Sequence, residues 1–264
     1  MKRSPDQPIT IQGNACFVSD MHFHVPADDE SRFREELLVQ FLHQIGHQLH
    51  HLFLLGDIFD FWFEYQDVMP KGYFKLFNTL YDLRCKGVQI YYFTGNHDMW
   101  LQDFFPEQIG CEVFHETQLF VINGKRCLVG HGDGLGGKQY GYRFIKSIFA
   151  FKPNQFVYSM LHPRIAFSIA RFFSWKSRKS HENQELCFRN EEEPQIRFAR
   201  QVLQSEPVDY FIFAHLHLPY HYSLTDQSSY FNCGDWLTHK SYLLFMSNEQ
   251  GPTLCDFNED INNE

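Results

Sequence analysis

Short apolar runs alternate with stretches of helical periodicity along the first hundred residues. The runs at 15–20, 51–57 and 88–93 are rich in aromatic and branched residues and predict buried strands. Between them, residues 31–50 and 71–87 repeat apolar side chains every three or four positions, which predicts two helices. This order indicates an α/β fold whose strands are at least partly parallel and covered by helices.

The second half of the chain follows a different pattern. Two apolar runs within residues 117–133 flank Asn123-Gly124, a dipeptide typical of tight hairpin turns. Three further strands are expected at 208–217, 228–236 and 239–247. Because no internal repeat or low-complexity linker divides the sequence, we expect one domain over its whole length.

Polar side chains of metal-binding type follow five of these strands, in the segments SDMH, GDIFD, GNHD, GHGD and AHLH. In open α/β sheets, ligands gather beyond the carboxyl ends of the strands. A single D-x-H or H-x-H is common without a metal, but this ordered set is improbable as coincidence. The candidate side chains are Asp20, His22, Asp57, Asn96, His97, Asp98, His131, Asp133, His215 and His217.

These motifs resemble D-x-H, G-D, G-N-H-D, G-H and G-H-x-H of the calcineurin-like metallophosphoesterases, from about Cys16 to Trp236. The resemblance implies two packed mixed β-sheets flanked by helices, an αββα sandwich. It also implies two metal sites that share Asp57. The implied ligands are Asp20, His22, Asp57 and His217 for the first metal, and Asp57, Asn96, His131 and His215 for the second. Ala214 replaces the Gly of the last motif, which changes a backbone contact and no ligand.

The ligand types predict the chemistry. Oxygen and imidazole donors without thiolate favour Mn²⁺, Fe²⁺, Zn²⁺ or Mg²⁺. Two such ions about 3.5–4 Å apart activate a shared water and hold the attacking and leaving oxygens of a phosphoryl displacement. We therefore expect a metal-dependent hydrolase of phosphoesters or phosphoanhydrides. The resemblance makes Asn96, His97 and Asp98 catalytic, with His97 facing the leaving group and Asp98 orienting its ring.

Residues 134–181 differ from the rest in composition, with nine Lys and Arg, eleven aromatics and no Asp or Glu. The whole chain carries −9, so the remainder carries −18. Charge separated in this way indicates a surface that meets an anionic partner. Because the periodicity is helical and the position lies between two strands, we predict a helical cap at 134–204, inserted in the single domain 1–264.

A closer resemblance narrows the substrate. The segments FLLGDIFDFWFEY, HGDGLG, YGYRF, FSWKSRKSH and CGDW resemble the UDP-2,3-diacylglucosamine hydrolases, pyrophosphatases of the lipid A pathway. The resemblance implies an insertion that binds acyl chains, Mn²⁺, and release of UMP and 2,3-diacylglucosamine 1-phosphate. It further implies peripheral attachment to the inner membrane, which an acid-free aromatic cap suits. Candidate substrate contacts are Tyr142, Arg143, Arg171, Ser174, Lys176 and Arg178.

Two alternatives stay open. The best-known branch of that family has Arg at the position of His97, so another nucleotide diphosphate or phosphoester remains a possible substrate. A non-catalytic scaffold with this fold is the second alternative, although it would be expected to lack ligands and none is missing. The basic residues are mixed with aromatics at helical spacing, which argues against nucleic acid. No obligate protein partner is evident.

Cysteine usage and hydropathy indicate the compartment. The seven Cys are scattered, odd in number and without a C-x-x-C pair, as is typical of reduced thiols in the cytoplasm. No stretch has the length of a signal peptide core or the ~20 apolar residues that cross a bilayer. We therefore expect a cytoplasmic protein, peripheral on the cytoplasmic face of the inner membrane.

Overall fold

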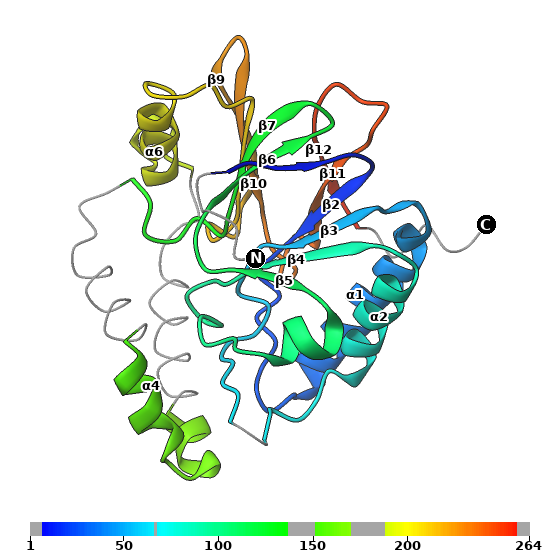
Figure 1. Cartoon of the computed structure of the whole chain (residues 1–264), viewed down its shortest axis with the longest axis vertical. Helices are drawn as coiled ribbons and strands as arrows, with labels where there is room; N and C mark the ends of the chain where they lie inside the picture. The colour runs from blue at the N-terminus through cyan, green and yellow to red at the C-terminus, as the bar shows by residue number, and fades with distance from the viewer. Residues whose placement is uncertain (1–6, 66–67, 137–150, 170–187, 258–264) are drawn as a thin grey trace.

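Two six-stranded sheets pack against each other at the centre of the fold (Figure 1). The computed structural model describes residues 7–65, 68–136, 151–169 and 188–257. One sheet has the strand order β12-β11-β2-β3-β4-β5, and the other has the order β1-β6-β7-β8-β10-β9. Helices cover the outer faces, which gives the expected αββα sandwich.

The first sheet contains the three strands predicted before residue 100. Its strands are β2 (Ala15–Val18), β3 (His51–Leu54), β4 (Gln89–Phe93), β5 (Glu112–Phe114), β11 (Ser241–Phe245) and β12 (Thr253–Asp256). Strands β2 to β5 run parallel, and β11 pairs antiparallel with both β2 and β12. The carboxyl ends of β2, β3 and β4 therefore lie at one edge of the molecule.

The second sheet contains the predicted hairpin. Its strands are β1 (Ile9–Ile11), β6 (Gln118–Ile122), β7 (Lys125–Val129), β8 (Tyr210–Phe213), β9 (Pro219–Thr225) and β10 (Ser228–Cys233). Asn123 and Gly124 join β6 to β7 with φ of 51° and 82°, which confirms the tight turn. Strand β8 runs parallel to β7 and β10, so β7 and β8 end side by side.

Aromatic side chains fill the space between the sheets. Phe17 and Phe53 stack within the first sheet at 4.4 Å between ring centroids. Phe53 meets Phe120 of the second sheet edge to face at 5.1 Å, and all three side chains are buried. This interface fixes the two sheets relative to each other, and with them the strand ends that carry the candidate ligands.

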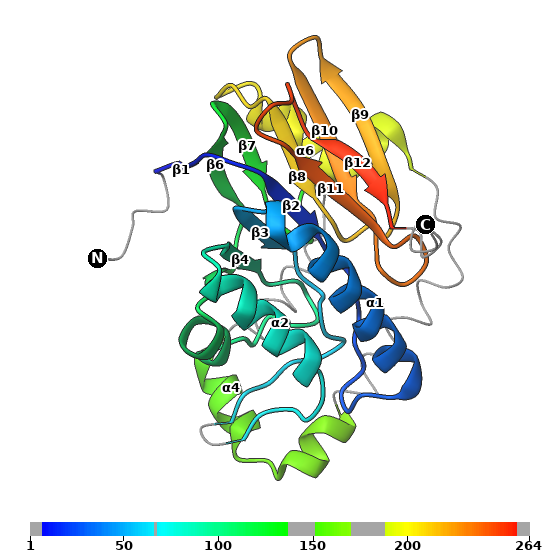
Figure 2. The same ribbon diagram turned by 90° about the vertical axis from the view of Figure 1, so that its right-hand side faces the viewer.

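Helices α1 (Asp29–Ile45) and α2 (Phe74–Cys85) cover the first sheet and lie next to each other (Figure 2). Asp28 caps α1 by accepting a hydrogen bond from the Ser31 amide at 2.9 Å. Leu38 and Phe41 are buried in the core formed with this sheet. Helix α6 (Pro194–Val202) covers the second sheet, where Ile196 is buried.

Two helical segments lie at the opposite end of the molecule from β9 (Figures 1 and 2). They are α4 (Lys152–Ser159) and residues 163–169. The expected cap 134–204 also includes α6, which packs on the second sheet, so we place α6 with the layers of the sandwich. The rest of the cap stays a prediction. The described residues also include short helical turns at Gly46–Gln48, Phe104–Ile109 and Asn190–Glu192. No described helix is long and apolar enough to cross a membrane.

Candidate metal centre

The predicted ligands lie at the carboxyl ends of five strands, where the two sheets meet. Asp20 and His22 follow β2, Asp57 follows β3, and Asn96 follows β4 in the first sheet. The second sheet contributes His131 after β7, and His215 and His217 after β8. All seven side chains come together at one place, as the motif order predicts.

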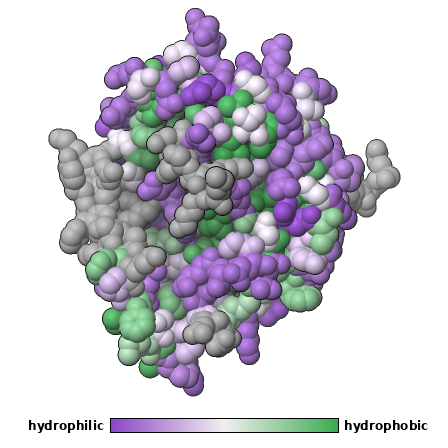
Figure 3. Space-filling model, viewed as in Figure 1, coloured by the Kyte–Doolittle hydropathy of each residue, from purple (hydrophilic) through white to green (hydrophobic). Residues whose placement is uncertain are grey.

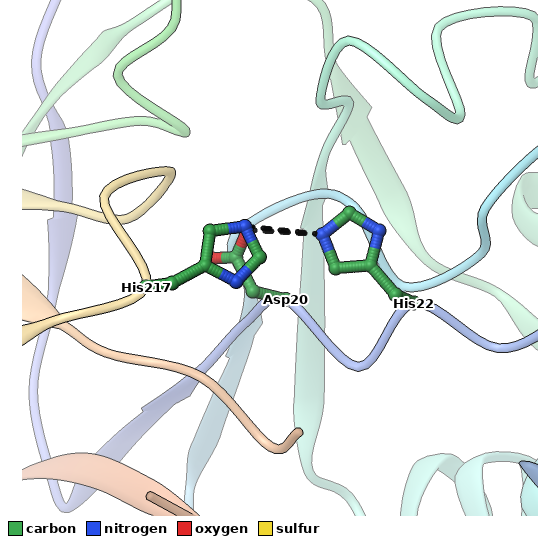
Figure 4. Close-up of side chains that lie close together, drawn as sticks. All are labelled: Asp20, His22 and His217. Atoms are coloured by element: carbon green, nitrogen blue, oxygen red, sulfur yellow. Dashed lines mark hydrogen bonds and ion pairs between the residues drawn. The ribbon is translucent and has the colours of Figure 1, made fainter. Parts of the chain in front are cut away.

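The first group consists of Asp20, His22 and His217 (Figure 4). The Nε2 atoms of the two imidazoles are 3.3 Å apart, and they lie 3.7 Å and 3.5 Å from Oδ1 of Asp20. This Oδ1 is buried and has no hydrogen-bond partner among the described residues. A buried carboxylate oxygen facing two imidazole nitrogens fits a divalent cation, which would satisfy all three.

The second group contains Asp57, His131 and His215, whose ligand atoms lie within 4.8 Å of one another. Nε2 of His131 is 3.3 Å from Oδ2 of Asp57 and 3.3 Å from Oδ1 of Asn96. The same Asp57 oxygen is 3.8 Å from Nε2 of His22 in the first group. Asp57 therefore lies between the two groups, in the position that a bridging carboxylate requires.

Five of the predicted ligands have a left-handed backbone, which non-glycine residues seldom adopt. Their φ angles are 53° for Asp20, 45° for His22, 50° for Asp57, 73° for His215 and 54° for His217. Each such residue costs on the order of 1–3 kcal/mol and persists where the surrounding structure enforces it. Strain that is concentrated on these residues supports a functional site.

Three imidazoles are oriented by hydrogen bonds on the side away from the centre. Nδ1 of His131 lies 2.7 Å from the Leu55 carbonyl oxygen, Nδ1 of His22 lies 3.1 Å from Asp60 Oδ1, and Nδ1 of His217 lies 3.4 Å from Asp235 Oδ2. Such partners direct Nε2 toward a metal. Asp60 and Asp235 belong to GDIFD and CGDW, but the sequence did not indicate which imidazole each would meet.

Two imidazoles of the centre have a raised pKa because buried carboxylates surround them. Burial lowers the pKa of His22, but hydrogen bonds to Asp20 and Asp60 outweigh it and raise this pKa to about 10. Burial also lowers the pKa of His131, and the negative charge of Asp57 raises it to about 10. A cation held by these side chains would displace their protons, so binding of the cation would release protons.

Asp98 has a different role from the one expected. Its Oδ1 accepts a hydrogen bond from the Gly95 amide at 2.7 Å, and its Oδ2 accepts from the Ile58 amide at 2.9 Å and the Tyr92 hydroxyl at 2.6 Å. Burial and the charge of Asp57 raise the pKa of Asp98 to about 6. The carboxylate thus holds the loops that follow β3 and β4.

His97 is oriented by Asp60. Its Nδ1 lies 3.0 Å from the Asp60 main-chain carbonyl oxygen, to which it donates a hydrogen bond. The expectation that Asp98 orients this ring is therefore wrong, because the Asp98 oxygens are engaged by backbone amides and a phenol. The His97 and His22 rings meet edge to face at 4.9 Å, so His97 lies beside the first group.

The candidate substrate residues Tyr142, Arg143, Arg171, Ser174, Lys176 and Arg178 lie outside the described residues. The loop after Asp57 leads to an aromatic shelf formed by Phe61, Phe63 and Trp100. Tyr158 of α4 packs on Phe63 and Trp100, with ring centroids 4.9 Å and 4.8 Å apart. The sequence pattern did not predict this contact, which joins α4 directly to the loop that leaves the centre.

Comparison with known proteins agrees with the geometry in indicating a phosphoesterase site. The sequence model described as calcineurin-like phosphoesterase matches residues 14–219. A curated UDP-2,3-diacylglucosamine hydrolase from Porphyromonas gingivalis is 31% identical over 248 residues, covering 89% of this chain and 95% of that protein. One from Histophilus somni is 26% identical, covering 88% and 96%.

Among solved structures, the phosphoesterase Yfce from E. coli is similar with a TM-score of 0.41 and 16% identity, covering 93% of this chain and all of that one. The family match spans every predicted ligand on an αββα sandwich whose strand ends carry the full donor set. The chain therefore belongs to the calcineurin-like phosphoesterase family and is a metal-dependent phosphoesterase or pyrophosphatase.

Proposed function

We propose that the protein hydrolyses the pyrophosphate of UDP-2,3-diacylglucosamine, giving UMP and 2,3-diacylglucosamine 1-phosphate (lipid X) in lipid A biosynthesis. The observation that carries this proposal is a relative of that name, which is 31% identical and matched over 95% of its length. The complete donor set supports an active enzyme over a scaffold, because a protein without turnover has no need to keep it.

Two divalent cations, which we propose to be Mn²⁺, would supply the positive charge that activates water and draws electrons from the phosphorus. The residues proposed to hold them are Asp20, His22, Asp57, Asn96, His131, His215 and His217. Asp57 would hold both ions at a fixed separation. Because the carboxylates only partly offset the charge of two dications, the site remains attractive to a diphosphate.

His97 would act on the leaving oxygen. Its Nδ1 hydrogen is directed to the Asp60 carbonyl oxygen, so Nε2 can donate only when the ring is protonated. Burial lowers the pKa of His97, which favours the neutral ring in the free protein. An anionic diphosphate beside the ring would raise this pKa again. A sugar phosphate with a second pKa of about 6 leaves without full protonation, so an imidazolium could act through charge.

We extend the proposal to the membrane. Within residues 134–181, the described part exposes Phe156, Val157, Met160 and Ile165, each at more than half of its surface. Hydrophobic residues gather at the lower left of Figure 3, where Figure 1 places α4. Apolar side chains on helices that bear Lys and Arg without acids suit an anionic leaflet. We therefore propose peripheral attachment to the cytoplasmic face of the inner membrane.

Incubation of the purified protein with Mn²⁺ and UDP-2,3-diacylglucosamine tests the proposal, with UMP as the product measured. The Asp57→Asn variant is the matched control, because it keeps the shape of the side chain and removes the bridging charge. Its turnover should fall by more than about 100-fold, since even outer partners of metal ligands contribute 10–100-fold. Absence of UMP, together with turnover of a soluble phosphoester, would contradict the proposed lipid substrate. It would not contradict the proposed metal centre.

A further inference from the structure

His24 connects the candidate metal centre to the first turn of α1 through two carboxylates. Asp60 accepts from Nδ1 of His22 through Oδ1 at 3.1 Å, and its Oδ2 lies 3.3 Å from Nε2 of His24. Nδ1 of His24 contacts Asp28, the residue that caps α1. We infer that His24 is a positioning residue, which acts on the predicted ligand His22 through Asp60.

A carboxylate orients an imidazole only if its own position is fixed. Asp60 is buried with 6% of its surface exposed, and it lies in the loop after β3. His24 belongs to the loop after β2 and contacts the Asp60 oxygen that is not bonded to His22. The carboxylate is thereby held between two imidazoles from the same loop, so it cannot rotate without breaking one contact.

The main chain of His24 is anchored as firmly as its ring. Its amide donates to Ser31 Oγ at 2.9 Å, and its carbonyl oxygen accepts from the Tyr73 hydroxyl. Arg34 of α1 donates to the His22 carbonyl oxygen at 3.2 Å. Residues 22–24 are therefore fixed to the start of α1, which gives His24 a rigid base.

Displacement of Asp60 would disturb two functional side chains. Its carboxylate orients His22, and its main-chain carbonyl accepts from Nδ1 of His97 at 3.0 Å. Among the described residues, His24 belongs neither to the two groups of the centre nor to the third cluster that could hold a metal ion, which is formed by His22, Asp60 and His97. The contact between its ring and Asp60 is the link through which we expect it to act on the centre. The inference rests on the metal centre of the proposed function and does not depend on the lipid substrate.

A double-mutant cycle with metal affinity as its readout tests this inference. Mn²⁺ binding to the metal-free full chain is measured by calorimetry for His24→Leu, Asp60→Asn and the double variant. We expect His24→Leu to weaken Mn²⁺ binding by about 10-fold, at the lower end of the range for outer partners of metal ligands. The double variant should bind no more weakly than Asp60→Asn alone, because residues of one network are not additive.

Two further variants separate positioning from folding. His24→Gln keeps a donor toward Asp60 and should recover most of the lost affinity. Asp28→Ser keeps a cap for α1 but is too short to reach the ring, and it should weaken Mn²⁺ binding slightly. If His24→Leu does not fold, these two variants carry the test. His47→Leu, at an exposed histidine after α1, is the matched control.

Unchanged Mn²⁺ affinity in His24→Leu would overturn the inference. Additive losses in the double variant would also overturn it, since His24 would then act by another route. Failure of the wild type to bind Mn²⁺ would instead contradict the metal centre. Failure to release UMP with normal Mn²⁺ binding would contradict only the lipid substrate.

Discussion

Asp57 connects the two groups of imidazoles, and its two oxygens have different partners. Oδ2 faces His131 at 3.3 Å and His22 at 3.8 Å, while Oδ1 accepts from the His97 amide at 2.8 Å. The main chain of His97, which follows the candidate ligand Asn96, is thus held in place by the Asp57 carboxylate. A substitution of Asp57 should therefore also displace the main chain of His97.

Two substitutions can distinguish proton donation by His97 from stabilisation by its positive charge. We expect His97→Gln to lower kcat by about 10²–10⁴-fold, the usual range for a proton donor, with the metal content unchanged. His97→Arg keeps a fixed charge and lacks a transferable proton at neutral pH. Recovery of kcat in this variant would assign the role to charge. A loss of bound metal in His97→Gln would contradict a role confined to the leaving group.

The motifs singled out the seven candidate ligands that the structure brings together, because each follows an apolar strand and has a characteristic spacing. They did not predict the partners that orient the imidazoles. Asp60 and Asp235 meet His22 and His217 only after loops distant in sequence have come together. The pairing of Asp98 with His97 was wrong for a related reason. Neighbours in sequence point apart here, and the Asp98 carboxylate turns back to bind backbone amides.

The sequence pattern predicted the interior strands of both sheets and missed every edge strand. The four strands without a prediction are β1, β5, β9 and β12, and each lies at the edge of a sheet. Three of them have only three or four residues, and β9 has mostly half-buried or exposed positions. Edge strands are short and polar because this prevents pairing with other chains, so they lack a continuous apolar pattern.

The cap of α1 makes a prediction about stability and pH. Slight burial raises the pKa of Asp28, but contacts with His24 and the Ser31 amide outweigh it and lower this pKa to about 2. A carboxyl group with a lowered pKa stabilises the folded state above its unfolded pKa of about 3.9, and this contribution is lost as the pH falls toward 2.

We therefore expect Asp28→Ala to lower the free energy of unfolding by about 1 kcal/mol at pH 7. The difference from wild type should shrink as the pH falls below 4, and urea unfolding at several pH values measures it. Asp28→Ser has a cap that does not titrate, so its difference from Asp28→Ala should be constant. A wild-type advantage that is independent of pH would show that the charge of Asp28 contributes nothing.

The aromatic shelf joins α4, which belongs to the segment 134–181 without Asp or Glu, to the candidate metal centre. Tyr158 of α4 contacts Trp100, which follows the GNHD motif by two residues. The Tyr65 hydroxyl donates to the Leu161 carbonyl oxygen at 3.2 Å, which ties the helical segments to the loop beyond Asp57. Helical periodicity and the position between two strands predicted a helical segment here. The sequence pattern did not predict this contact, because the aromatic packing depends on side chains from two loops and from α4.

The proposed attachment to membranes makes a prediction about the exposed face of α4. Replacing Phe156 and Met160 by Ser should reduce binding to anionic vesicles by about 10-fold or more, because each side chain loses roughly 1 kcal/mol of apolar transfer. Co-sedimentation with vesicles that contain phosphatidylglycerol measures this. Tyr81→Ser, at a half-exposed aromatic of α2, is the control and should bind as wild type does. Equal binding by all variants would place the membrane contact elsewhere.

The ratio of two specificity constants tests whether the enzyme is built for a lipid substrate. kcat/KM is measured for UDP-2,3-diacylglucosamine and for UDP-N-acetylglucosamine, which has the same pyrophosphate without the two long acyl chains. Because binding energy from remote parts of a substrate accelerates the reaction at its centre, we predict a ratio of about 10³ or more in favour of the acylated substrate. Equal values for the two substrates, or faster cleavage of the soluble one, would contradict an enzyme built for the lipid.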